Sequence, residues 1–155
     1  MATTITPATA TITITEVFTQ NGSVITKTTG VGMTVASVTY SDTRVMAIPS
    51  SGEISVLGFV TGGATIGAGT FLESTVRYIR ISNRDGANFI RYRYINTGAE
   101  VVDRKLLAGK TDIITDLNFD TLIAGGAFGA FVYPDFLMAQ ADTAPVDIEY
   151  TIIVG

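Results

Sequence analysis

The feature that most constrains the fold of this chain is its large share of side chains branched at Cβ. Of 155 residues, 55 are Thr, Ile or Val, whereas Leu, Lys, Glu and Gln together number 17. Branching at Cβ crowds a helix and suits the pleated surface of a sheet. Sixteen glycines, many of them beside Asn, Asp or Ser, supply turn signals at short intervals. We therefore predict an all-β protein, an antiparallel β-sandwich of jelly-roll-like or Ig-like (immunoglobulin-like) topology with little or no helix.

The alternation of apolar and polar residues divides the chain into strands. In the strand expected at residues 9–18, Ala10, Ile12 and Ile14 alternate with threonines, which is the period-2 signature of a half-buried strand, and Asn21-Gly22 marks a tight turn. Residues 1–8 are small and polar, so we expect a flexible N-terminal arm, followed by a single sandwich domain over residues 9–155. Further strands are expected at residues 23–28, 31–40, 44–48, 54–60, 76–82, 89–96, 101–107, 112–119 and 146–154, with an irregular apolar loop over residues 121–139.

The chain contains neither histidine nor cysteine, which restricts its chemistry. These absences remove disulfides, thiol nucleophiles, the commonest general base and the commonest neutral metal ligand. What remains is carboxylates, lysines and hydroxyls. A glycosidase needs only two carboxylates about 5 to 9 Å apart, but each of the five glutamates falls on the polar side of an expected strand or beside a turn. The glutamates are Glu16, Glu53, Glu73, Glu100 and Glu149.

Three partial motifs do not match their families. Ala108-Gly109-Lys110-Thr111 resembles the end of a phosphate-binding loop, but Arg104 replaces the required glycine, so we interpret it as a hairpin turn. Residues 116–120 begin like a calcium loop that lacks its glycine and its closing glutamate. Residues 67–72 begin like a dinucleotide fingerprint that lacks its third glycine. We therefore predict no catalytic residue, no cofactor and no metal, and no enzymatic activity.

The most distinctive surface feature is a cluster of arginines. Five of the seven arginines lie within residues 77–93, interleaved with aromatic residues. We expect residues 76–82 and 89–96 to pair as a β-hairpin with an apolar face toward the core and a cationic outer face. Arginine recognises carboxylates, phosphates and aromatic rings. The candidate protein-contact residues are Arg77, Arg80, Arg84, Arg91, Arg93 and Tyr78.

Two other interpretations of the arginine cluster remain open. The arginines can form a solvated face and pair with nearby Asp and Glu. Basic strands interleaved with aromatics also occur in proteins that bind single-stranded nucleic acid. The net charge of −4 disfavours a nucleic-acid or anionic membrane partner, and we predict neither.

Three stretches, at residues 77–90, 106–110 and 139–153, resemble small virion structural proteins encoded by tailed phages. The shared pattern is a strand with Arg-aromatic-aliphatic alternation, an Asn-x-Asp turn, a Leu-x-Ala-Gly turn and a closing Glu-aromatic strand. The resemblance implies a β-sandwich capsid decoration (cement) protein, or another accessory subunit of the head or tail.

On this basis we expect a non-enzymatic protein of the virion, assembled in the host cytoplasm, that binds and stabilises neighbouring capsid subunits. Its partners would be capsid or other virion proteins and further copies of itself, for example in a trimer. The loops at residues 62–69 and 125–132, with the arm, would supply contact area. The N-terminus lacks the pattern of a secretory signal. The alternative is a carbohydrate- or receptor-binding module of a phage tail or other surface assembly, with a stacking platform drawn from Tyr78, Tyr92, Tyr94 or Tyr133.

Overall fold

The computed structural model describes residues 8–62, 68–96, 101–120 and 131–155. These residues form an all-β protein with one 3-10 turn, η1 (Glu73–Thr75). Within these ranges, no helix is long and apolar enough to cross a bilayer. The chain divides into two compact units, Met1–Tyr40 with Gly155, and Ser41–Val154, where the sequence predicted one domain over residues 9–155. All but the last residue of the expected flexible arm lies outside the described residues.

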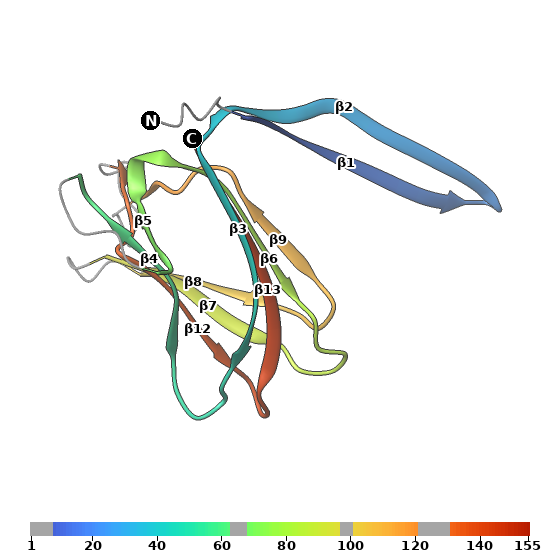
Figure 1. The fold of residues 1–155 in the computed structure, drawn as a ribbon. Helices are drawn as coiled ribbons and strands as arrows, with labels where there is room; N and C mark the ends of the chain where they lie inside the picture. Colours follow the sequence, from blue (N-terminus) through green and yellow to red (C-terminus); the bar gives the residue numbers. More distant parts are fainter. Residues whose placement is uncertain (1–7, 63–67, 97–100, 121–130) are drawn as a thin grey trace. The chain divides into compact units, whose positions relative to one another are not determined.

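The strands of the two units are shown in Figure 1. The first unit contains β1 (Ala8–Gln20) and β2 (Ser23–Val38), which pair as a two-stranded antiparallel sheet. The second unit begins within β3 (Tyr40–Ile48) and holds the other strands. These are β4 (Ile54–Val60), β5 (Thr70–Leu72), β6 (Val76–Asn83), β7 (Ile90–Ile95), β8 (Val101–Leu106), β9 (Thr111–Ile114), β10 (Phe119–Asp120), β11 (Phe131–Val132), β12 (Phe136–Ala141) and β13 (Val146–Val154).

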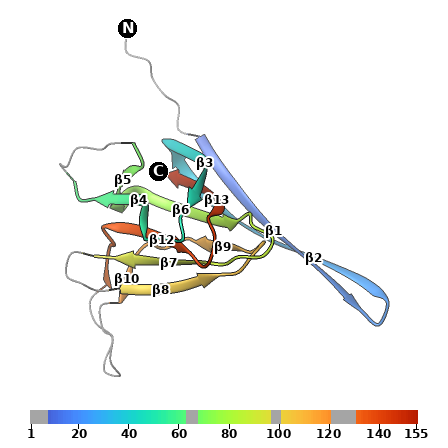
Figure 2. The ribbon, with the colours of Figure 1, turned by 90° about the horizontal axis from the view of Figure 1, so that it is seen from below.

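The second unit is a jelly roll, one of the two topologies that the sequence predicted. Its two main sheets have the strand orders β3-β13-β6-β9 and β5-β4-β12-β7-β8, and they form two layers in Figures 1 and 2. Without the short edge strand β5, which runs parallel to β4, the eight strands follow the double Greek-key order of a jelly roll. The first and last strands of this unit, β3 and β13, are therefore neighbours in one sheet.

The core of the jelly roll lies between the two sheets and follows the alternation of its strands. Ile79 and Ile81 on β6 and Ile148 on β13 point into it, with at most 1% of their surface exposed. Leu137 on β12 and Tyr92 on β7 come from the other sheet. Fully burying an aliphatic side chain stabilises a fold by about 1.5–3 kcal/mol. The same pleat points the residues between them outward.

The predicted hairpin of residues 76–82 and 89–96 is wrong, because β6 and β7 belong to different sheets. The chain crosses between the layers at Asn83, whose side chain is buried at 2% exposure. Its Nδ2 donates to the carbonyls of Asn88 (2.9 Å) and Leu106 (3.2 Å), and its Oδ1 accepts the N–H of Asp85 (2.9 Å). A turn-rich stretch that looks like a hairpin loop is thus an anchored crossover.

The hairpin turn predicted at Gly109 is also a crossover. Lys110 donates its N–H to the carbonyl of Leu107 at 3.1 Å, and Gly109 has a φ of 66°. A left-handed third residue is the signature of a type II turn, so the turn itself is confirmed. It joins β8 and β9, however, which lie in different sheets, so the two strands do not pair.

A third difference concerns residues 121–139, predicted to be an irregular apolar loop. Residues 121–130 lie outside the described part, but β12 is a strand that pairs with β4 on one side and β7 on the other. Leu137, Ala139 and Ala141 are buried in alternation. The apolar residues Phe136 and Met138 on the opposite face hide this period from the sequence. In the first unit, β2 is also continuous where two runs were predicted.

Candidate interaction surface

The first unit is built around the predicted Asn21-Gly22 turn. Asn21 and Gly22 have φ values of 49° and 78°, and Gln20 and Ser23 face each other on either side of them. Two left-handed residues in a two-residue loop form a type I′ turn, whose twist matches that of antiparallel strands. The turn sets the register of the hairpin between Gln20 and Ile14, and the register shifts between Ile14 and Ile12 and again between Ala10 and Ala8. The hairpin is far longer than the N-terminal arm expected from the sequence.

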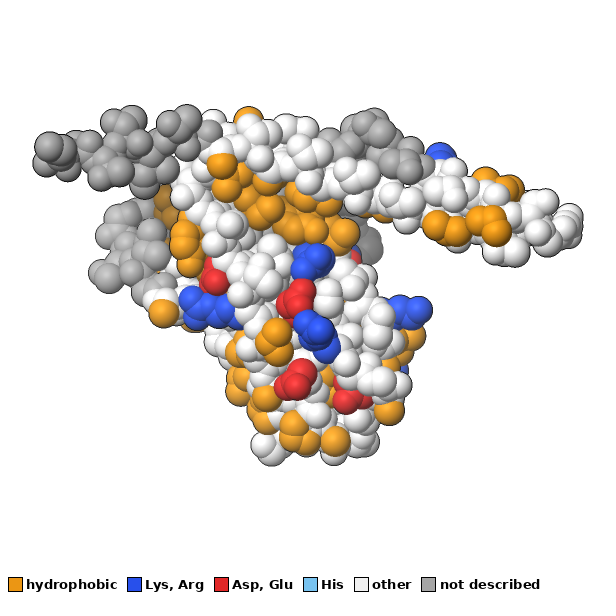
Figure 3. Space-filling view, turned by 45° about the vertical axis from the view of Figure 1, so that its right-hand side comes forward, with side chains coloured by type: hydrophobic (Ala, Val, Ile, Leu, Met, Phe, Trp, Pro, Cys, Tyr) orange, Lys and Arg blue, Asp and Glu red, His pale blue; other side chains and the backbone are white. Residues whose placement is uncertain are grey.

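Large apolar side chains are exposed along this hairpin. Every residue from Thr13 to Lys27 is exposed. Phe18 (52% exposed) pairs across the strands with Ile25 (48%). On the other face, Val17 and Val24 are exposed by 63% and 66%. Figure 3 shows hydrophobic side chains on the hairpin surface. Exposed apolar side chains that lie next to one another mark interaction sites more often than singly scattered ones do.

The hairpin carries almost no charge. Within residues 8–38 the charged residues are Glu16 and Lys27, which face each other across the strands. Soluble proteins usually protect free strand edges with lysines, prolines or inward-pointing charges. Within the described residues β1 and β2 pair only with each other, so both outer edges lack a third strand. The outer edges of the hairpin can therefore pair with a further strand, and its exposed apolar side chains can pack against a partner.

The structure divides the arginine cluster predicted from the sequence. Arg77 and Arg80 lie on β6 and Arg84 follows it, whereas Arg91 and Arg93 lie on β7 in the opposite sheet. Because the two sheets have their outer faces on opposite sides of the sandwich, no single cationic face unites the five side chains. The predicted patch resolves into two smaller groups.

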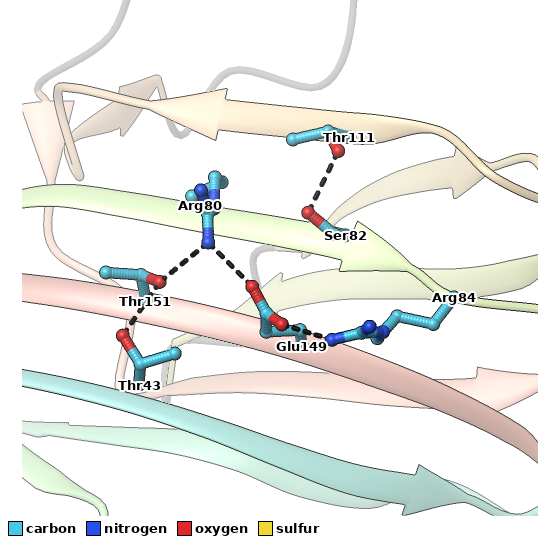
Figure 4. A network of polar contacts seen from close by, with 7 residues as sticks. All are labelled: Thr43, Arg80, Ser82, Arg84, Thr111, Glu149 and Thr151. Carbon is cyan, nitrogen blue, oxygen red and sulfur yellow. Dashed lines mark hydrogen bonds and ion pairs between the residues drawn. The ribbon is translucent and has the colours of Figure 1, made fainter. Parts of the chain in front are cut away.

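Two arginines of the first group, Arg80 and Arg84, belong to a polar network on the outer face of the β3-β13-β6-β9 sheet (Figure 4), whereas Arg77 donates to the Ser74 carbonyl at 2.9 Å. Arg80 donates to Glu149 Oε1 (2.7 Å) and to Thr151 Oγ1 (3.1 Å), and Arg84 pairs with the other oxygen of Glu149. The hydroxyls of Thr43 and Thr151 lie 3.0 Å apart. The network links β3, β13 and β6. Arg80 and Arg84 thus pair with an acidic residue, as the interpretation of a solvated face predicted.

The second group lies on the outer face of the other sheet. Arg93 forms ion pairs with Glu53 and with Asp103, the latter at 3.3 Å. Lys105 places its Nζ 3.7 Å from the centre of the Phe89 ring. Arg91 is exposed and forms no ion pair with a residue that the structure describes. A surface depression is lined by Phe89, Arg91, Arg93, Asp103, Arg104 and Lys105.

The tyrosines predicted to contact a partner are buried. Tyr78, Tyr92 and Tyr94 are exposed by 5%, 2% and 7%, and Tyr133 packs partly buried against the core. Tyr78 is therefore unavailable as a contact residue. The stacking platform for a carbohydrate does not form from these side chains either. In the Arg-Tyr-Arg-Tyr run of β7, the arginines point outward and the tyrosines point inward.

The Tyr92 hydroxyl takes part in a link between the two sheets. It donates to the Asp112 carboxylate on β9, which also accepts from Arg104 Nη1 on β8 at 2.7 Å. Burial raises the pKa of Tyr92, and its hydrogen bond to Asp112 raises it further. Burial alone would raise the pKa of Asp112, but the hydrogen bonds from Tyr92 and Arg104 outweigh it and lower that pKa. The arrangement supports the edge of the sandwich.

The glutamates that were considered as catalytic carboxylates lie beside charged residues or outside the described ranges. Glu53 and Glu149 pair with arginines, Glu16 faces Lys27, and Glu100 lies outside the described residues. The pKa of Glu73 is raised by partial burial and by the nearby Asp135 carboxylate. Across the described ranges, no three Asp or Glu side chains gather closely enough to hold a metal ion.

The loops expected to supply contact area fall mostly outside the described residues, at 63–67 and 125–130. Of the remaining loop residues, Phe131 is exposed by 68%. Comparisons of the chain with models of protein families, with curated proteins and with solved structures found no match.

Proposed function

We propose that this chain is a non-enzymatic structural subunit of a tailed-phage virion, a capsid decoration protein. The hairpin β1–β2 binds a neighbouring virion subunit, and the jelly-roll unit provides a rigid body stabilised by its own core. The chain stabilises the capsid through contact area and not through chemistry.

The observation that carries this proposal is the exposed apolar surface of the hairpin. Phe18, Ile25, Val17 and Val24 keep about half or more of their surface in water. An isolated two-stranded hairpin is at best marginally stable in water, and it needs a third strand or a packed face. Each square ångström of apolar surface that a partner covers contributes about 25 cal/mol. The hairpin therefore gains both stability and affinity by docking.

Two further observations support a virion role. The residues at 77–90, 106–110 and 139–153 resemble small virion structural proteins. The jelly roll is an architecture used repeatedly by viral capsid domains and by lectins. A shared architecture does not assign a function by itself. It agrees here with the sequence resemblance and with a surface suited to assembly.

The charge of the hairpin predicts how such binding responds to salt. Its single Glu16–Lys27 pair leaves it neutral, so the contact relies on apolar burial and backbone hydrogen bonds. Salt screens charged contacts but does not screen apolar burial, which sulfate and phosphate strengthen. Binding to the capsid should therefore survive high salt, in contrast to a contact made by the arginine groups.

The test is co-sedimentation of the purified chain with expanded capsids of the phage that encodes it. We expect binding at micromolar concentration, and a loss of at least tenfold in affinity for Phe18→Ser and Ile25→Ser. Val45→Ser is a matched control, since Val45 is an exposed apolar residue on β3 of the other unit (58%). Absence of capsid binding by the unaltered chain would overturn the proposal. So would full binding by both hairpin variants.

A glycan array with the same protein separates the alternative function. Specific glycan binding without capsid binding would assign the chain to the carbohydrate- or receptor-binding class. Binding to capsids that high salt abolishes would move the contact from the hairpin to the arginines.

A further inference from the structure

The strand β1 contains a sequence palindrome. Residues 11–15 read Thr-Ile-Thr-Ile-Thr in both directions, with Thr13 at the centre. A strand of this kind presents the same side chains in the same order to an antiparallel copy of itself. Two-fold symmetric contacts require such self-complementarity, because residue i contacts residue j and residue j contacts residue i.

The palindrome lies on a strand edge that is open within the described residues. β1 pairs with β2 on one side, and the two strands form a sheet of their own. Thr11, Thr13, Ile14 and Thr15 are exposed. No proline or charge interrupts residues 8–15, so the alternate residues whose backbone points away from β2 all have an N–H and a C=O for a second ladder.

We infer that the open edge of β1 pairs antiparallel with β1 of a second copy of this chain, about a two-fold axis at Thr13. This inference rests on the proposed function, in which the hairpin is the assembly element, and it names the partner of one of its edges. The apolar tip around Phe18 and Ile25 stays available to the capsid subunit.

The side chains match in this register. Ile12 lies opposite Ile14 of the second copy, Thr11 opposite Thr15, and Ala10 opposite Glu16. β-branched pairs and threonine pairs stabilise antiparallel strands, and no two like charges meet. The symmetric contact joins two hairpins into one four-stranded sheet. Three or more strands with an apolar face are what an independent sheet requires.

The two-fold axis also places the isoleucines and Phe18 of the two copies on the same face of the joined sheet. Because residues of equal parity share a face, Ile12, Ile14 and Phe18 of one copy lie on the same side as those of the other. The opposite face carries the threonines of β1 together with Val17. The face that holds Ile12, Ile14 and Phe18 would then be presented to the capsid by two copies at once, which adds avidity to the contact.

Distances between labels on two copies test this pairing directly. The chain has no cysteine, so Thr13→Cys and Thr19→Cys each carry a single spin label on the same face of β1. At Thr13 the two backbones should be adjacent, with Cα atoms about 5 Å apart. At Thr19 the labels are separated by twelve residue steps, or roughly 40 Å. A short distance at Thr13 with a long one at Thr19 supports the inference.

Variants at the edge supply a second readout. Thr13→Pro should reduce the dimer measured by light scattering to monomer, whereas Thr13→Val, which keeps the backbone N–H, should retain it. A monomeric unaltered chain, a trimer, or equal label distances at the two positions would overturn the inference. Capsid co-sedimentation distinguishes the failures. A monomer that still binds capsids leaves the proposed function intact, and a dimer that does not bind them removes only that function.

Discussion

The jelly roll and the hairpin use the same side chains in opposite ways. On β6 and β13, Ile79 and Ile148 alternate with polar residues and are fully buried. On β1 and β2, Ile14 and Val24 belong to a similar alternation and are exposed by 53% and 66%. The alternation encodes a strand with one face to be covered, but it does not specify what covers it. In the jelly roll the cover is a second sheet of the same chain, and for the hairpin we propose that it is another molecule.

The largest expected effect compares a core residue with a hairpin residue. Leu137→Ala should lower the free energy of unfolding by about 2–5 kcal/mol, because it leaves a cavity between the sheets. Phe18→Ala should change it by less than about 0.5 kcal/mol, as for an exposed site. Urea unfolding of both variants measures the difference. Comparable losses would mean that the hairpin packs within the chain, and the comparison would fail.

Two asparagines test the same contrast for polar groups. Asn83→Ala should cost about 2–3 kcal/mol, since it leaves the carbonyls of Asn88 and Leu106 without their buried donor. Asn21→Gly should be almost neutral, because glycine adopts the left-handed turn without strain. Thermal unfolding of both variants provides the measurement. A stable Asn83→Ala protein would show that the crossover does not depend on this side chain.

The link between Tyr92, Asp112 and Arg104 makes a smaller, pH-dependent contribution. The pKa of Asp112 is lowered in the folded protein, so its stabilising effect is complete above the unfolded value near 4. That effect is lost as the pH falls through the lowered folded pKa. Asp112→Asn should therefore cost about 1 kcal/mol at neutral pH and progressively less in acid. The exposed hairpin variant Glu16→Gln is the control, and equal pH profiles would contradict the role of Asp112.

The smallest expected effect has the opposite sign. The pKa of Glu73 is raised, so its ionised form disfavours the folded state at neutral pH. Glu73→Gln should stabilise the protein by a few tenths of a kcal/mol at pH 7. The gain should disappear once the pH is low enough to protonate Glu73 in both states. Unfolding curves at neutral and acid pH measure the change, and a loss of stability at pH 7 would contradict the expected sign.

The strand content was predictable because it follows local rules. The share of β-branched residues, the Asn21-Gly22 turn and the terminal alternation at residues 146–154 identified the all-β class and most of the strands. The pairing was not predictable in this way. Asn83 and Gly109 look like hairpin turns in sequence, and only the partners of their backbones show that they cross between sheets.

The candidate surface was predicted less well than the fold. The arginines between positions 77 and 93 are close in sequence, but the crossover after β6 places them in two sheets. The sequence predicted β1 as a half-buried strand of the sandwich, because its alternation with threonine has the same period as such a strand. One available signal was charge, since residues 8–38 hold a single acid and a single base. A long strand pair without charged gatekeepers is the pattern of a contact surface.

The adjacency of β3 and β13 has a consequence for biosynthesis. The jelly roll cannot close its β3-β13-β6-β9 sheet until residues 146–154 have left the ribosome, because β13 separates β3 from β6. The hairpin needs only neighbouring residues, and hairpins form within about 1–10 μs, while translation proceeds at about 5–20 residues per second. Nascent chains on one polysome would thus expose the apolar β1–β2 hairpin for seconds before their jelly-roll units fold. The pairing that we infer between two copies would then begin during synthesis.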